Sequence, residues 1–104
     1  MDSKIILAVS SVLFTLSLIT QVVHAACAMD RTGTVYCSRF ASGGAELGSE
    51  GAVVCGRGEC ARNKFGQFEC SMEAGGGAAR NRWGLVRCLG GCEAASEGLC
   101  EEGK

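Results

Sequence analysis

The residues of this sequence best suited to chemistry are its eight cysteines, which follow a regular spacing. From Cys27 onward they run C-x9-C-x17-C-x4-C-x9-C-x17-C-x3-C-x7-C. A short chain with so many cysteines either pairs them as disulfides or uses thiolates to hold a metal ion. Two close pairs, Cys55/Cys60 and Cys88/Cys92, have a loosely zinc-like spacing. The compartment decides between these chemistries, because an oxidising environment removes the thiolates that zinc needs.

The N-terminus predicts export to such an environment. A short polar start with one lysine precedes a strongly apolar run, residues 5–19. This pattern predicts a signal peptide, residues 1–25, cleaved after Ala25 or Ala26. The alternatives are an uncleaved anchor, which needs about 20 apolar residues, and a lipoprotein acylated at Cys27. We expect a secreted protein (extracellular, or periplasmic if bacterial) with disulfides, no metal site and no membrane attachment after cleavage.

Catalytic groups are scarce in the predicted mature chain. Its only histidine, His24, belongs to the signal peptide, which excludes Ser-His and Cys-His nucleophile pairs. The glutamates are scattered, and neither a redox Cys-x-x-Cys motif nor a phosphate-loop lysine motif is present. We therefore expect a non-enzymatic protein with no catalytic residue and no cofactor.

Two dipeptides predict a binding surface instead. Lys64-Phe65 and Arg82-Trp83 each stand immediately before the glycine of a predicted turn. Turn tips face solvent, where loops commonly carry function. An aromatic ring beside a cation can stack on a sugar or anchor a partner protein. The alternative interpretation is that both rings fold back as lids over a thin core, since so small a domain buries little apolar surface.

Charge narrows the choice of partner. The 104 residues include 10 Lys or Arg and 11 Asp or Glu, a formal net charge of -1. This balance argues against nucleic acid, which needs a strongly basic face, and against a cationic membrane-lytic peptide. Locally, Arg80, Arg82 and Arg87 surround Trp83, whereas the C-terminal end is acidic. Such a basic patch could contact an acidic partner.

The elements that position these residues follow from an internal duplication. Three cysteines recur 33 residues further on: Cys27, Cys37 and Cys55 as Cys60, Cys70 and Cys88. Several glycines recur at the same offset. We therefore divide the mature domain, residues 26–104, into repeat 1 (27–59), repeat 2 (60–91) and a truncated third repeat (92–104).

Each repeat contains two segments in which a turn and a glycine lead into a short strand ending in cysteine. An opening Asp or Asn, as in Asp30-Arg31-Thr32-Gly33, predicts a type I turn closed by a left-handed glycine. With residues 31–33 as the loop, Cys27 lies opposite Cys37 at a site where Cα atoms approach to about 4.5 Å. That distance allows a disulfide. The same register predicts three further oppositions: Cys60 with Cys70, Ala45 with Cys55, and Ala78 with Cys88.

Four cysteines have no partner within these hairpins. Cys92 and Cys100 occupy the positions of a hairpin pair in the third repeat, around Gly98. We favour a Cys92–Cys100 bridge, which leaves Cys55–Cys88 to join one repeat to the next. Four cysteines allow three pairings, and the sequence leaves the choice open.

The sequence thus predicts a small all-β, disulfide-rich domain of tandemly repeated short β-hairpins. Its expected role is that of an exported, non-catalytic cysteine-rich binding protein, such as a ligand, effector or surface-associated module. The expected partner is an extracellular protein or glycan, and not nucleic acid. The alternatives are a secreted defence peptide or toxin acting on other cells, and an inhibitor of secreted hydrolases, for which no bait loop stands out.

Overall fold

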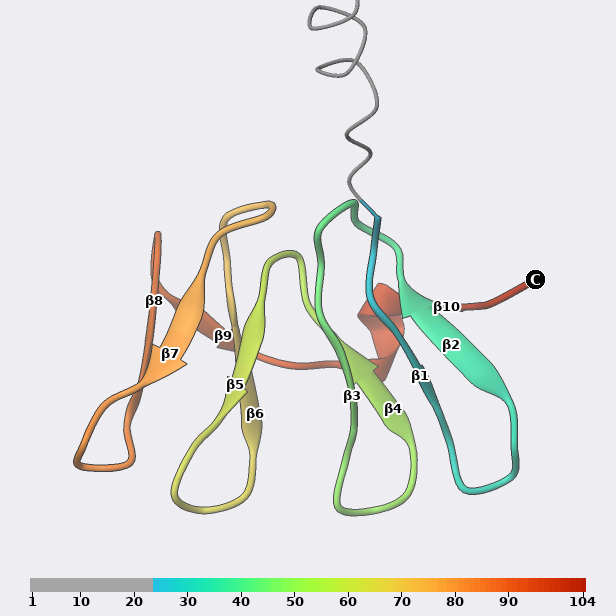
Figure 1. Cartoon of the computed structure of the whole chain (residues 1–104), viewed down its shortest axis with the longest axis horizontal. Helices are drawn as coiled ribbons and strands as arrows, with labels where there is room; N and C mark the ends of the chain where they lie inside the picture. The colour runs from blue at the N-terminus through green and yellow to red at the C-terminus, as the bar shows by residue number, and fades with distance from the viewer. Residues whose placement is uncertain (1–23) are drawn as a thin grey trace, which may run out of the picture.

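The computed structural model of the chain describes residues 24–104. Residues 1–23 of the predicted signal peptide lie outside the described residues. Four antiparallel hairpins stand in a row, with their turns along one edge (Figure 1). Their strands are β1 (Cys27–Met29) with β2 (Val35–Ser38), β3 (Ala45–Leu47) with β4 (Val53–Cys55), β5 (Cys60–Arg62) with β6 (Phe68–Ser71), and β7 (Ala78–Arg80) with β8 (Val86–Cys88). The predicted all-β class with short antiparallel hairpins is confirmed.

The register within each hairpin is the predicted one. Cys27 lies opposite Cys37, and a disulfide joins them with their Cα atoms 3.9 Å apart. Cys60 and Cys70 form the equivalent bridge at the same Cα separation, 3.9 Å. Ala45 faces Cys55, and Ala78 faces Cys88, in the second hairpin of each repeat.

Turn chemistry explains this register. The Asp30 carboxylate accepts hydrogen bonds from the backbone N–H groups of Thr32 and Thr34, each at 2.9 Å. The turn then closes on Gly33, whose φ of 92° is favourable only for glycine. Asn63 and Asn81 accept the corresponding bonds in the third and fourth hairpins.

Residues 92–104 differ from the predicted third hairpin. They form β9 (Cys92–Ala94), the 3-10 turn η2 (Glu97–Leu99) and β10 (Cys100–Glu102). These two strands do not pair with each other: β9 extends the sheet of β5 and β6, and β10 extends the sheet of β1 and β2. The C-terminal segment therefore runs from one repeat to the other (Figure 1).

The two added strands take equivalent places. Cys100 pairs with Ser38 of β2. Cys92 pairs with Ser71 of β6, which is the equivalent of Ser38 at the offset of 33 residues. The segment thus supplies the same third strand to each repeat in turn. A two-stranded hairpin is only marginally stable by itself. The shared segment adds a third strand to the first hairpin of each repeat, while β3–β4 and β7–β8 remain pairs.

This arrangement corrects the predicted pairing of the last four cysteines. The disulfides are Cys55–Cys100 and Cys88–Cys92, not Cys55–Cys88 and Cys92–Cys100. The reason is the position of the added strands. Each one brings its cysteine to the second hairpin of the repeat that it joins, with Cα separations of 5.3 and 5.1 Å. All eight cysteines are therefore oxidised, and the thiolate arrangement considered for zinc is not formed.

The interior is thin and consists largely of disulfide sulfur. Half of the buried apolar residues in the described part of the chain are cysteines; the full set is Ala45, Val53, Cys55, Cys70, Val86 and Cys100. Two serines are also buried: the hydroxyl of Ser38 donates to the carbonyl of Gly56, and that of Ser71 to the carbonyl of Leu89. Within residues 24–104, no helix has the length and apolarity needed to cross a membrane.

Candidate functional site

The hairpin turns are joined in pairs within each repeat. In repeat 1 the backbone N–H of Arg31 donates to the carbonyl of Gly51 at 3.2 Å. In repeat 2 the backbone N–H of Lys64 donates to the carbonyl of Gly84 at 2.9 Å. Each repeat therefore presents its two turns as one fixed unit at the lower edge of Figure 1.

A close side-chain contact reinforces each pair. Gly84 has a φ of 81°, and a methyl group placed on its Cα would lie 2.6 Å from Cβ of Lys64. The Lys64 side chain thus crosses the neighbouring turn at a point where only glycine leaves room. Arg31 crosses Gly51 in the same way, with its Cδ 2.6 Å from such a methyl group. The contact places Lys64 beside the turn that carries Arg82 and Trp83.

Both aromatic residues predicted to lie at the tips are exposed. Phe65 is 74% exposed and Trp83 is 63% exposed. The lid interpretation requires both rings to cover the core, and neither ring does so. A cationic side chain lies over each ring. Nζ of Lys64 is 5.3 Å from the ring centroid of Phe65, and Cζ of Arg82 is 4.5 Å from that of Trp83. We call these four residues the tip platform: Lys64, Phe65, Arg82 and Trp83.

Repeat 1 shows that the fold does not need the aromatic rings. At the offset of 33 residues, the positions of Phe65 and Trp83 are occupied by Thr32 and Glu50. The same register and the same hydrogen bond between turns form around these polar residues. The rings are thus an addition to repeat 2, made on a backbone that is complete without them.

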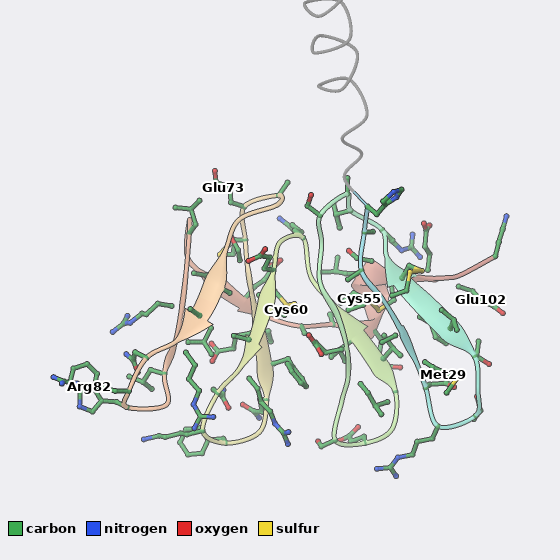
Figure 2. The ribbon with its side chains drawn as sticks, in the orientation of Figure 1. Met29, Cys55, Cys60, Glu73, Arg82 and Glu102 are labelled. Atoms are coloured by element: carbon green, nitrogen blue, oxygen red, sulfur yellow. A yellow bond between two sulfur atoms is a disulfide. The ribbon has the colours of Figure 1, made fainter. Side chains whose placement is uncertain are left out.

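The platform cations have no carboxylate partner in the part of the chain that the structure describes, where the single ion pair is Arg57 with Glu93 at 3.5 Å. From Cys60 to Cys88 the sequence has five basic residues and two glutamates. Glu69 accepts a hydrogen bond from the Asn63 side chain at 3.0 Å, and Glu73 lies at the edge opposite the turns (Figure 2). Repeat 2 therefore presents unneutralised positive charge at its turns.

A groove that the sequence does not reveal lies beside the platform. It has a volume of about 530 Å³ and separates the β3–β4 turn from the β5–β6 turn, where the two repeats meet. Phe65 and Phe68 form part of its wall, Ala94 and Ala95 belong to the C-terminal crossing segment, and three carboxylates line it: Glu50, Glu69 and Glu97. No local motif reveals this groove, because segments distant in the sequence form it together.

Residues 24–104 contain neither a free thiol nor a cluster of metal-ligating side chains. Every cysteine in this part is in a disulfide, and no group of three or more His, Cys, Asp or Glu residues of residues 24–104 is arranged to hold a metal ion. No protein-family model matches the chain, and neither a curated protein nor a solved structure matches it significantly.

Proposed function

We propose that this chain is an exported, non-catalytic binding protein, and that its tip platform contacts an extracellular protein or glycan. The observation that carries the proposal is the exposure of Phe65 and Trp83, at 74% and 63%, on turns whose repeat 1 counterparts are polar. Four disulfides are consistent with an oxidising environment, as expected for an exported protein.

Rigidity supports this role. A surface that is ordered before binding loses little conformational entropy when a partner arrives. The Cys60–Cys70 bridge ties the strands beneath one turn, and the hydrogen bond from Lys64 to Gly84 fixes that turn to its neighbour. Tryptophan and arginine are also the residues most often dominant in binding energy at protein interfaces.

The test replaces the two rings by the residues that repeat 1 already uses. In the variant with Phe65→Thr and Trp83→Glu, we expect the fold to persist, because Thr32 and Glu50 occupy the same turn positions. Binding to the partner should weaken by at least about tenfold, as for loss of a dominant contact residue. The measurement compares both proteins against purified secreted proteins and against neutral and acidic oligosaccharides.

The control is Thr32→Ser with Glu50→Gln, which alters repeat 1 at the same turn positions and should leave binding unchanged. Intact-mass analysis establishes that each variant keeps its disulfides, and the dispersion of its amide NMR signals establishes that it keeps its fold. Equal binding of the same ligands by the wild type and the ring variant would refute the tip platform as the contact surface. A parallel growth-inhibition assay with the oxidised protein addresses the alternative of a defence peptide or toxin.

A further inference from the structure

We propose that the tip platform binds an acidic polysaccharide, a polymer of sugar rings that carry carboxylate or sulfate groups. This inference rests on the proposed function and names the chemical class of its ligand. It follows from three properties of the platform: unneutralised charge, exposed ring faces, and the presence of the same structural unit twice.

The charge of the surface selects an anion. Lys64 and Arg82 have no carboxylate within ion-pair distance among residues 24–104. The acidic C-terminal strand lies elsewhere, because Arg82 and Glu102 are at opposite ends of the row of hairpins (Figure 2). The molecule is therefore polarised despite its net charge of -1, and its field attracts anions toward repeat 2.

The rings select a ligand with flat, weakly polar faces. A sugar ring presents C–H groups that pack on an aromatic face, while its acidic substituent can reach a cation beside that face. Both parts are present in Phe65 with Lys64 and in Trp83 with Arg82, where the cations lie 5.3 and 4.5 Å from the ring centroids. Exposed cation–aromatic pairs are weak by themselves, so they remain available to a ligand.

Repetition favours a polymer over an acidic protein. The same dipeptide, a base followed by an aromatic residue, occupies the same turn position in two neighbouring hairpins. The Lys64–Gly84 hydrogen bond holds these hairpins in one fixed relation. A polysaccharide repeats a ring and an anion along its length, so that successive units can engage successive pairs. The acid-lined groove beside Phe65 disfavours continuation of an anionic chain in that direction.

The probe molecules are oligogalacturonate and a sulfated glycosaminoglycan fragment, titrated into the full chain after export and purification in its oxidised form. Trp83 is the only tryptophan, so its fluorescence reports directly on the platform. We expect a saturable change in emission with at least one of the two acidic sugars and none with a neutral oligosaccharide. Added salt should weaken the binding, because it screens exposed charges.

The chain supplies matched variants for this measurement. Lys64→Ser removes a platform cation, whereas Arg31→Ser removes the equivalent cation of repeat 1, which has no aromatic neighbour in the turn. We expect the first to weaken binding by about tenfold or more and the second to change it less than twofold. Calorimetry extends the comparison to Trp83→Glu, for which fluorescence is lost.

A gain of binding makes the test independent of damage to the fold. Substituting Thr32→Phe, Ser49→Arg and Glu50→Trp rebuilds the platform on repeat 1, where Arg31 already stands in the place of Lys64. We expect the number of short acidic oligosaccharides bound per chain to double, as measured by calorimetry. Intact mass and the amide spectrum verify the disulfides and the fold of each variant.

The controls separate this inference from the proposed function. Poly-glutamate and vesicles of anionic phospholipid carry negative charge without sugar rings. If either binds the platform as tightly as the acidic sugars, or if neither acidic sugar binds at all, the polysaccharide inference is wrong while the tips can still serve another partner. If a ligand binds but the variants at Lys64 and Trp83 bind it like the wild type, the tip platform itself is wrong.

Discussion

One side chain organises the turn in three of the four hairpins. Asp30, Asn63 and Asn81 each accept backbone N–H groups two and four residues later, so these hydrogen bonds lie entirely within the turn. The acid differs from the amides because it can be titrated. Hydrogen bonds from the Thr32 hydroxyl and the Thr34 N–H lower the pKa of Asp30 below its ordinary value.

This difference predicts a pH dependence that Asp30→Asn removes. A carboxyl group whose pKa is lower in the folded state stabilises the fold above its unfolded pKa, and this contribution is lost as pH falls through the folded pKa. We expect the wild type to lose stability as pH falls below the unfolded pKa of an aspartate and through the lowered pKa of Asp30, and Asp30→Asn to lose less over the same range. Urea unfolding with the disulfides intact measures both.

Asn81→Asp provides the converse control, since it introduces a titrating group that accepts the same two backbone N–H groups in the fourth hairpin and should increase the loss at low pH. An identical pH profile for the wild type and Asp30→Asn would show that Asp30 does not stabilise the folded turn through these hydrogen bonds.

The C-terminal segment connects the two repeats, because β9 and β10 complete one sheet in each. Its two disulfides close chain loops of very different length, with separations of 45 residues for Cys55–Cys100 and 4 for Cys88–Cys92. The segment also exchanges two backbone hydrogen bonds of 2.9 Å between Cys55 and Ser96. These contacts hold together hairpins that have little apolar core of their own.

Loop length predicts unequal effects on stability when the two bridges are removed. In the chain-entropy description, replacing both cysteines by serine costs about 4 kcal/mol for Cys55–Cys100 and about 2 kcal/mol for Cys88–Cys92. Denaturant unfolding of the two double variants tests this order. A larger loss for the Cys88–Cys92 pair would contradict the role of the longer bridge in joining the repeats.

Digestion with a glutamate-specific protease under non-reducing conditions tests the connectivity. Cleavage after Glu93 and Glu97 separates Cys92 from Cys100, while Cys88 and Cys92 remain on one peptide. We therefore expect the Cys55 peptide to be linked to the short peptide that contains Cys100. A link from Cys55 to the peptide that ends at Glu93 would contradict the Cys55–Cys100 bridge, since that peptide contains Cys88 and Cys92.

The molecule as a whole is a row of hairpins in which sulfur replaces much of an apolar interior. Among residues 24–104, three of the six buried apolar residues are cysteines, while several large apolar side chains are exposed. Small domains bury too little surface to be stable without such cross-links. The same construction leaves the turns at one edge free to vary, as the contrast between Thr32 and Phe65 shows.

Full reduction should therefore unfold the protein. After treatment with a reductant and alkylation of all eight cysteines, we expect the dispersed amide spectrum to collapse to that of a disordered chain. The oxidised protein at the same pH and temperature is the control. A reduced, alkylated chain that kept its dispersion would show that the fold does not depend on its disulfides.

Local features of this protein could be predicted from the sequence, and long-range ones could not. The turn type, the hairpin register and the Cys27–Cys37 and Cys60–Cys70 bridges were correct, because opposed positions in a tight hairpin depend only on the length and chemistry of the turn. The partners of β9 and β10, and with them Cys55–Cys100 and Cys88–Cys92, depend on how the hairpins pack. Strands of three residues carry too little pattern to specify a distant neighbour.

The tip platform likewise has features that the sequence predicts and features that only the folded chain shows. Its four residues were identified from their types and their place before a turn glycine. The exposure of both rings, the lack of an ion-pair partner for Lys64 and Arg82 among residues 24–104, and the contact between Lys64 and Gly84 are visible only in the folded chain. Composition and spacing decide what a turn is made of, but whether its side chains face solvent or the core depends on which segments pack against it.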